Sequence, residues 1–400
     1  MWRNAEKIEK ICGRIFLLFF LILLPIVWIR LFMIGEKADN LELEGRKPER
    51  IPEFTKEDFL NTSYQEQLEK GLSDQLPLSE TMRTKYLSSR NITFNSLAWL
   101  SVQPNSNYRL VADDLYTYKD YDYLITRNFN KTRDNFSKNE LEIDRSFDYY
   151  SNLPIKNKYQ YIATNDTVLD FDNINYDLID WFEAKYPSFK QAHLEVPDFE
   201  TYANYYYKND HHWNYKGSYQ GYKDIIRLIL GPKEKLLKPS ETVEFSYNTK
   251  GSRSRIAFYT NFHENFTAYR FYLKKHDTYM NGIKMEYGHQ NEYFTDNNLR
   301  NGVGEISYGD FYGYDVSDIL YDFKQPNREN LIIIGFSYTN ALNEIVASHF
   351  NKTWVFDTRF CRRSDFEKII SENNIQNILL LPNAGAYIPA MPDEAKGYDN

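Results

Sequence analysis

The last quarter of the chain constrains the fold most, because short apolar runs alternate there with helical patterns. The runs at 330–334, 353–356 and 375–381 have the length and composition of buried strands. Helical patterns at 341–350 and 365–372 separate them. Strands that alternate with helices at this spacing are typical of a parallel sheet, so the sequence predicts the α/β class.

The elements expected upstream are less regular. Helical patterns lie at 64–72, 79–87, 138–153, 177–186 and 215–230. Strands are predicted at 159–163 and at 108–118, the latter with a turn at Asp113 and Asp114. Segment 200–207 fits either a helix or a strand, and segment 247–301 has few apolar runs, which indicates irregular or antiparallel structure.

The N-terminal segment 15–34 is apolar apart from Arg30 near its end. Its twenty residues are enough to cross a bilayer as a helix. The residues before it include four basic side chains, at Arg3, Lys7, Lys10 and Arg14. A cleaved signal peptide is the alternative, but no small-x-small cleavage site follows the run. The sequence therefore favours an uncleaved anchor with a cytoplasmic N-terminus.

This topology divides the chain into four parts. They are a cytoplasmic tail (1–14), a transmembrane anchor (15–34), a stalk (35–55) and an extracellular domain (56–400). The stalk is polar and charged and contains Pro48 and Pro52, as expected of a linker. The predicted location is the cell membrane, with a single span and the large domain outside.

Composition excludes some classes of partner. The net charge is −8, and no basic stripe lies beyond the first residues, which argues against nucleic acid. Two cysteines, Cys12 and Cys361, allow no disulfide framework and no cysteine-based metal site in the outer domain. The 34 tyrosines suit the stacking of sugar rings, but a general bias of the composition is the favoured explanation.

Two short motifs carry the residues of a nucleophilic site. Asp210 and His212 lie two positions apart, so in an extended segment they point the same way and His211 points opposite. Asn214 is placed to cap the helix at 215–230. Ser337 follows the strand at 330–334, at the edge of a parallel sheet where ligands bind.

Around Ser337 the sequence favours a tight turn. Gly335 permits that turn, and the helix that follows offers unpaired N–H groups to a developing oxyanion. Each motif alone is more often a turn or a surface pair than a catalytic site. Metal binding by Asp210, His211 and His212 is a further alternative, but it lacks a convincing additional ligand elsewhere, and no metal or cofactor is expected.

Taken together, the motifs resemble the DHHW family of extracellular SGNH-hydrolase-like proteins, which is related to the alginate O-acetyltransferases. The segments that carry the resemblance are 74–78 (DQLPL), 209–214 (NDHHWN), 311–315 (FYGYD), 334–338 (IGFSY) and 357–359 (DTR). The segment 209–214 contains the DHHW motif from which the family takes its name, and this motif is specific. The other segments support it. The resemblance implies a permuted SGNH-hydrolase-like fold, with a parallel sheet flanked by helices.

The resemblance also implies a function. Ser337 would be the nucleophile, His212 the base and Asp210 its orienting carboxylate, in a membrane-anchored O-acyltransferase or esterase. The substrate would be a cell-surface or exported polysaccharide, and a multi-spanning membrane acyltransferase would donate the acyl group. The alternative is a polysaccharide-binding or assembly scaffold with a decayed triad.

One departure from the family's pattern bears on that alternative. Phe336 stands where the family has Asp or Thr, so a polar contact at the nucleophile turn is lost. The candidates to complete an oxyanion hole are Gly251, Ser252 and Asn383.

Overall fold

The computed structural model describes residues 48–53, 63–76 and 107–394 apart from 113, 258–263, 286–288, 314 and 384, together with a few positions between 21 and 90. The chain divides into two compact units, residues 1–94 and 95–400. The expected anchor at 15–34 lies almost wholly outside the described residues. Within the described part of the chain, no helix has the length and apolar character to cross a membrane.

The first unit contains the helix α3 (Ser63–Gln75), which confirms the helix predicted over 64–72. Its last turn binds the segment before it. Asp74 accepts a hydrogen bond from the Glu49 backbone at 2.9 Å, and the Gln75 side chain donates to the Glu49 carbonyl oxygen at 3.0 Å. The helix predicted at 79–87 lies mostly outside the described residues.

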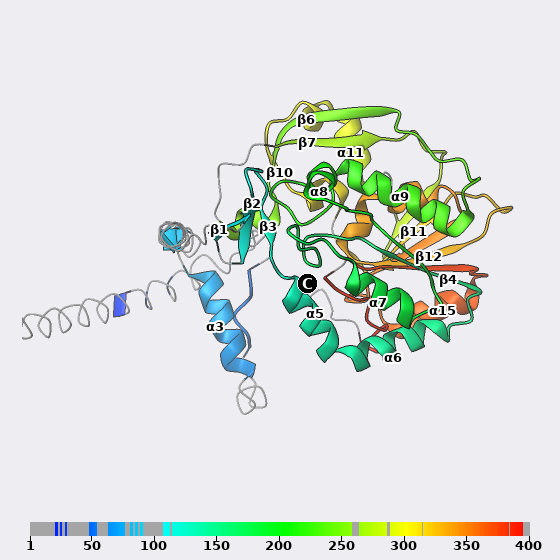
Figure 1. The fold of residues 1–400 in the computed structure, drawn as a ribbon, viewed down its shortest axis with the longest axis horizontal. Helices are drawn as coiled ribbons and strands as arrows, with labels where there is room; N and C mark the ends of the chain where they lie inside the picture. Colours follow the sequence, from blue (N-terminus) through cyan, green and yellow to red (C-terminus); the bar gives the residue numbers. More distant parts are fainter. Residues whose placement is uncertain are drawn as a thin grey trace, which may run out of the picture. The chain divides into compact units, whose positions relative to one another are not determined.

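The second unit is built on an eight-stranded sheet with the order β5-β4-β14-β12-β13-β11-β8-β9 (Figure 1). The strands are β4 (Asn157–Ile162), β5 (Lys190–His193), β8 (Asp277–Met280), β9 (Ile283–Met285), β11 (Asp318–Asp322), β12 (Leu331–Gly335), β13 (Lys352–Phe356) and β14 (Asn377–Leu381). The pairings from β5 to β13 are parallel. Those from β13 through β11 and β8 to β9 are antiparallel. The predicted α/β class with a parallel-rich sheet is confirmed.

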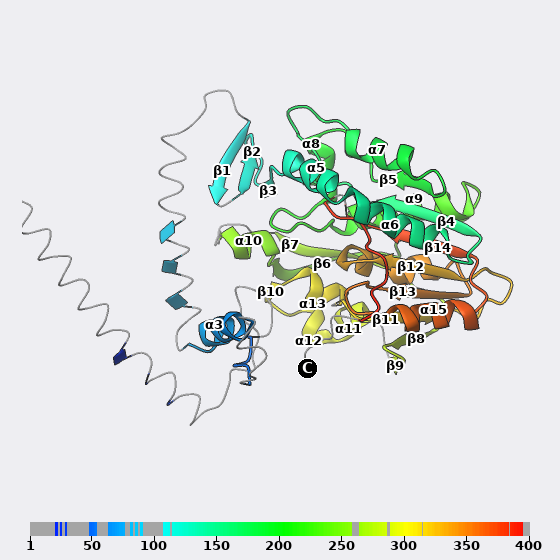
Figure 2. The ribbon, with the colours of Figure 1, turned by 90° about the horizontal axis from the view of Figure 1, so that it is seen from below.

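Helices cover both faces of the parallel half of the sheet. On one face, Tyr161 of β4 hydrogen-bonds to Asp224 of α9 (Tyr215–Leu230) at 3.2 Å, and α9 contacts α14 (Asn343–Ala347). On the other face, Phe356 of β13 packs against Phe366 of α15 (Arg363–Glu372). Figures 1 and 2 show α15 on the same side as α6 (Glu140–Ser151) and α7 (Asp177–Lys185), away from α9.

Two three-stranded sheets flank this core. One joins β1 (Tyr108–Ala112), β2 (Leu115–Tyr118) and β3 (Ile125–Thr126). The other joins β10 (Gly304–Ile306), β6 (Glu241–Thr249) and β7 (Asn265–Arg270). The turn predicted in 108–118 is present, with Asp114 at φ 42°. The antiparallel pairs β6–β7 and β8–β9 agree with the antiparallel alternative for 247–301.

The remaining helices refine the predictions. They are α5 (Phe129–Lys138), α8 (Phe199–Tyr205), α10 (Ser252–Ala257), α11 (His289–Thr295), α12 (Asn297–Arg300), α13 (Tyr308–Tyr312) and the 3₁₀ helix η1 (Ser337–Ala341). The ambiguous segment 200–207 is therefore mostly helical. The single helix predicted over 341–350 is instead the end of η1 followed by the short α14.

Candidate active site

The loop that carries Asp210 and His212 is closed at its base by backbone hydrogen bonds. Tyr206 and Trp213 form an antiparallel bridge, and the Asn214 N–H donates to the Tyr205 carbonyl oxygen at 2.7 Å. The Asn214 side chain then caps α9 by accepting from the backbone of Lys216 and Gly217, as predicted. The catalytic candidates thus stand directly before a capped helix of 16 residues, which is a rigid support.

Residues 249–253 hold the loop from the other side. The Asn209 amide donates to the Thr249 carbonyl oxygen at 2.8 Å and accepts from the Gly251 N–H at 3.0 Å. The Ser252 N–H donates to Asp210 Oδ2 at 2.8 Å. The prediction that Gly251 and Ser252 complete an oxyanion hole is therefore wrong, because both N–H groups are used to position Asn209 and Asp210.

A buried ion pair anchors this holding segment. The Arg253 guanidinium lies 2.6 Å from Asp166 Oδ1 and also donates to the Tyr202 hydroxyl and the Leu124 carbonyl oxygen. Both charged side chains are almost fully buried. Breaking such a pair leaves an uncompensated buried charge, which typically costs about 3–5 kcal/mol. No local pattern indicates Arg253, because the side-chain partners of its guanidinium lie 51 or more positions away.

Ser337 follows β12 at the carboxyl edge of the parallel strands. Phe336 is extended and precedes η1, so Ser337 is the first residue of the 3₁₀ helix. A Cβ atom at Gly335 would collide with the Thr339 side chain and lie 3.0 Å from the Leu381 carbonyl oxygen. The turn therefore requires the glycine, as the sequence predicted.

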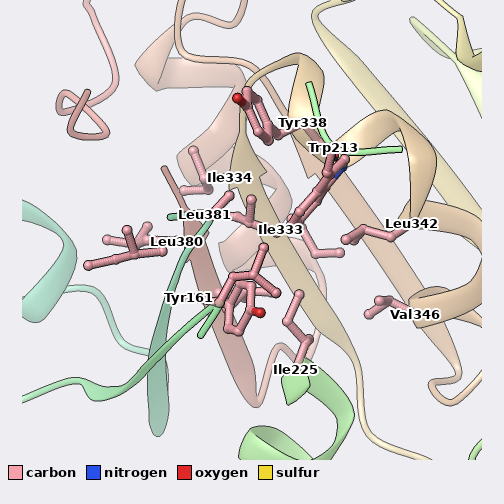
Figure 3. Close-up of a cluster of buried hydrophobic side chains, with 14 of the residues drawn as sticks. Tyr161, Trp213, Ile225, Ile333, Ile334, Tyr338, Leu342, Val346, Leu380 and Leu381 are labelled. Carbon is pink, nitrogen blue, oxygen red and sulfur yellow. Dashed lines mark hydrogen bonds between the residues drawn. The ribbon is translucent and has the colours of Figure 1, made fainter. Parts of the chain in front are cut away.

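Trp213 and Tyr338 bind the two motifs to each other across 125 positions of the chain. The Trp213 indole donates to the Tyr338 carbonyl oxygen at 3.1 Å, and the Tyr338 hydroxyl donates to the His211 carbonyl oxygen. Both rings are buried. In Figure 3 they lie beside the end of β12, next to a buried cluster that includes Ile333 and Leu342. Trp213 therefore packs beneath the loop and joins it to the segment that carries Ser337.

Ser337, His212 and Asp210 form a continuous line of hydrogen bonds. His212 Nε2 lies 2.7 Å from Ser337 Oγ, and His212 Nδ1 lies 2.6 Å from Asp210 Oδ1. Burial by itself raises the pKa of the Asp210 carboxyl. The neighbouring histidines and the hydrogen bonds from His212 outweigh burial and hold that pKa well below its ordinary value. Asp210 is therefore ionised at neutral pH.

Tyr308 of α13 is a further member of the site. Its ring stacks on the His212 imidazole with a centroid separation of 3.9 Å and an interplanar angle of 2°. Ser307 and Asp310 form a capping box that fixes the start of α13. That capping pattern is visible in the sequence, but the stacking partner, 96 positions upstream in the chain, is not.

His211 does not point away from Asp210, so that prediction is wrong. The loop bends at 208–212 instead of being extended. His211 Nδ1 consequently lies 3.3 Å from Asp210 Oδ1 and 2.8 Å from Ser252 Oγ. The ligand atoms of Asp210, His211 and His212 lie within 4.8 Å of one another, but both Asp210 oxygens and both His212 nitrogens already have hydrogen-bond partners in the protein.

Phe336 faces Arg359 rather than the histidine. The Arg359 guanidinium lies 5.1 Å from the centroid of the Phe336 ring, and it pairs with Asp357 and Asp315. The hydrogen bond between Ser337 and His212 forms with Phe336 in place. The departure from Asp or Thr at position 336 therefore leaves the geometry of these three side chains intact.

Several solved structures are similar to this chain. The structure of Bacillus cereus PatB1 is 19% identical, covers 67% of this chain and 95% of its own, and gives a TM-score of 0.48. A DHHW family protein from Eubacterium siraeum is 19% identical, with coverages of 60% and 84% and a TM-score of 0.43. The O-acetyltransferase domain of Pseudomonas putida AlgJ is 8% identical, with coverages of 68% and 91% and a TM-score of 0.37.

No family model matches the chain, and no curated protein matches it. The structural neighbours include a DHHW family protein and an O-acetyltransferase domain, the two groups that the sequence motifs resemble. The three structures are at most 19% identical to the chain and have TM-scores below 0.5. The chemistry of the site has to be derived from its own atoms.

Proposed function

We propose that the chain is a serine-dependent O-acyltransferase or esterase that acts on a cell-surface or exported polysaccharide. The observation that carries the proposal is the hydrogen-bonded line from Ser337 through His212 to Asp210, with bonds of 2.7 and 2.6 Å. A nucleophile within reach of a base, and a base oriented by a carboxylate, is the arrangement that activates a serine. The finer fold assignment, a permuted SGNH-like domain, is part of this proposal.

The hydrogen bonds define the direction of proton movement. Ionised Asp210 accepts from the His212 Nδ1–H, which leaves Nε2 unprotonated and facing the Ser337 hydroxyl. Ser337 Oγ attacks an acyl carbonyl while Nε2 takes the hydroxyl proton, and Asp210 stabilises the resulting imidazolium. His212 then gives that proton to the departing oxygen. In the second half, a sugar hydroxyl or water gives its proton to His212 and attacks the acyl-serine, whose Oγ regains the proton as it leaves.

Asn383 remains the candidate for stabilising the oxyanion. Gly335 at the end of β12 is paired with Leu381 at the end of the parallel strand β14. Ser337 and Asn383 each follow two residues after this pair, at the same edge of the sheet. Asn383 forms a parallel bridge with Ala163 there, and its side chain accepts from the Gly385 N–H. A side-chain amide at this edge is able to donate to a tetrahedral intermediate formed on Ser337.

The proposed setting of the enzyme rests on the apolar segment 15–34 and, for the acyl donor, on the family resemblance. The proposal includes an N-terminal anchor at 15–34, an extracellular outer domain, and a multi-spanning membrane acyltransferase as the acyl donor. The polysaccharide is the acyl acceptor in the transferase direction and the ester substrate in the esterase direction.

The test is turnover of an aryl acetate by the purified full chain. Ser337→Ala and His212→Ala should each lower kcat by at least about 10³-fold, because each removes a member of the triad. Ser348→Ala is the matched control, because this serine follows α14 and its hydroxyl donates to the Ile345 carbonyl oxygen. Covalent labelling of Ser337 by a sulfonyl fluoride should disappear in His212→Ala. Wild-type turnover in both triad variants would refute the assignment.

The scaffold alternative predicts a different pattern. A decayed site would show no aryl acetate turnover and no sulfonyl labelling in the wild-type chain, while glycan binding would persist in Ser337→Ala. The placement of Phe336 under Arg359, outside the line of hydrogen bonds, favours the enzyme over this alternative.

A further inference from the structure

A groove separate from the Ser337 site opens between α9, β7 and the segment 271–276. Its volume is about 430 Å³, which is large enough for several sugar units. Tyr215 and Tyr219 of α9 line one side, and Tyr269 of β7 and Tyr272 line another. None of the three residues in the hydrogen-bonded line of the active site contributes to its lining.

Two aromatic residues in contact, Tyr312 and Tyr308, connect the groove to the active site. Tyr312 lines the groove, and its ring centroid lies 4.8 Å from that of Tyr308. Tyr308 in turn stacks on His212. Ala341, the last residue of η1, also lines the groove, and η1 begins with Ser337. The groove and His212 therefore contact the same aromatic pair, Tyr312 on the groove side and Tyr308 on the side of the active site.

The walls of the groove present aromatic rings in a fixed arrangement. Tyr269 packs edge-on against Tyr215 and Tyr219, with centroids 4.7 and 5.5 Å away. Tyr272 is 69% exposed, yet the Arg270 guanidinium lies 4.9 Å from its ring centroid and holds it. An exposed ring held from one side is a ready platform for stacking a sugar ring on the other. The buried tyrosines of the core explain much of the tyrosine enrichment, but they do not explain Tyr272.

Charge at the groove is positive. Arg270 lies 3.6 Å from Glu241, a carboxylate that Arg300 also binds, and the His276 ring lies 3.1 Å from Glu344. Lys274 and Lys275 are exposed at the rim, and among the described residues neither has an ion-pair partner. Two unpaired ammonium groups beside a tyrosine wall fit a ligand that combines sugar rings with carboxylates.

We propose that this groove binds an acidic saccharide chain, with sugar rings stacked on the tyrosine wall and sugar carboxylates held by Lys274 and Lys275. The proposal rests on the function proposed above, since it makes an acidic glycan the polysaccharide substrate. Segment 271–276, rather than the sheet edge that carries Ser337, then selects the glycan.

The experiment measures binding of hexagalacturonate to the full-length protein at low ionic strength, by calorimetry. The Ser337→Ala protein is measured beside the wild type, so that binding is separated from turnover. Lys274→Ala/Lys275→Ala should weaken binding about tenfold, as expected for two exposed charge contacts. The double variant Lys233→Ala/Lys235→Ala, which removes two exposed lysines outside the groove, should bind like the wild type.

A second pair of variants tests the aromatic wall. Tyr272→Ala should weaken binding about fivefold, the range of a single stacking contact. Tyr121→Ala removes another exposed tyrosine, 40% exposed and remote from the lining, and should leave binding unchanged. Together, the two pairs separate the charge contribution from the stacking contribution.

Two comparison ligands complete the design. Maltohexaose, which is neutral, and hexaglutamate, which has charge without sugar rings, should each bind at least about tenfold more weakly. Equal affinity for either of them, or equal affinity in the lysine variants and the wild type, would overturn the proposal. If the wild-type chain shows no aryl acetate turnover but its binding of hexagalacturonate depends on Lys274 and Lys275, the proposed enzyme function is refuted and the proposed binding groove is supported.

Discussion

The two halves of the large sheet differ in burial and in what they carry. In the parallel half, every residue of β12 and of β14 is buried. In the antiparallel half, β8 is only partly buried and all of β9 is exposed. Parallel strands are covered by helices on both faces, whereas an antiparallel edge is able to face water. The difference separates a rigid support from an open surface.

The candidate catalytic serine lies at the buried, parallel half of the sheet, and the candidate binding groove includes residues of the exposed, antiparallel half. Ser337 lies directly beyond β12, where the buried strands fix the position of the backbone. The groove instead takes Thr278 from β8 and Met285 from β9. A site that needs sub-ångström positioning belongs on the buried half, and a surface that accommodates a long ligand belongs on the exposed edge.

The largest difference is expected between Asp210→Asn and Asp277→Asn. An amide at position 210 would donate to His212 Nδ1 and so place the proton on Nε2, which then cannot accept from Ser337. The expected loss in kcat for aryl acetate is about 10⁴-fold. Asp277 of β8 pairs with Lys284 and Lys324 at the exposed edge, so its change to Asn should leave kcat unaltered.

A loss of less than about tenfold in Asp210→Asn would mean that the carboxylate does not orient the histidine. Circular dichroism of both variants is the control for folding. An equal loss of kcat in the two variants would contradict the proposed difference between the two halves of the sheet.

The next largest effect compares two isoleucines. Ile333 of β12 is fully buried, and Ile333→Ala should lower the free energy of unfolding by about 3–4 kcal/mol, because it leaves a cavity under Trp213 and Leu342. Ile283 of β9 is 70% exposed, so Ile283→Ala should change the free energy of unfolding by less than about 0.5 kcal/mol. Denaturant titration of both variants measures the difference, and comparable values would show that the edge is packed more tightly than its exposure indicates.

The same division explains what the sequence predicted. The apolar runs that became β12, β13 and β14 are local patterns, and so were the helix over 215–230 and its Asn214 cap. The edge strands β8 and β9 have four and three residues and no apolar run, because the side chains of β8 are only partly buried and those of β9 are exposed. Nothing in their local sequence distinguishes them from a loop.

At the site, the sequence indicated the residues but not their surroundings. Asp210, His212 and Ser337 were visible as motifs, and the structure brings them together. The contacts of Tyr308 with His212 and of Ser252 with Asp210 join segments 42 or more positions apart, so only the folded chain reveals them. The same limit explains the error at His211, since a bend cannot be distinguished from an extended segment over three residues.

A smaller effect is expected from Tyr308→Leu. The tyrosine ring stacks flat on His212, where its π face favours the imidazolium that forms during the reaction. Removing it should lower kcat about tenfold while leaving KM for aryl acetate within about twofold. Tyr279→Leu on β8 is the matched control and should leave kcat unaltered. An unchanged kcat in Tyr308→Leu would mean that the tyrosine ring only packs against His212 and does not stabilise the imidazolium.

The smallest effect concerns Glu264, which holds the loop of Asp210 by accepting from the Lys208 N–H at 2.9 Å. Burial, only partly offset by that hydrogen bond and by Lys208, raises the pKa of this carboxyl to about 7. The folded chain therefore holds a proton that the unfolded chain releases near its ordinary pKa of 4.5. The contribution of the Glu264 carboxyl to the free energy of unfolding is fully present at low pH. It falls as the pH rises from about 4.5 to about 7.

Glu264→Gln should remove this pH dependence. The glutamine keeps an acceptor for the Lys208 N–H without burying a charge, so at pH 8 the variant should be more stable than the wild type by about 1–2 kcal/mol. Below about pH 4.5 the two should be equal within error. Glu292→Gln, at an exposed position of α11, should follow the wild type at every pH. A wild-type stability that rises between pH 4.5 and 7 relative to Glu264→Gln would mean that the Lys208 N–H and neighbouring charges outweigh burial, so that the loop of Asp210 is held by a carboxylate and not by an acid.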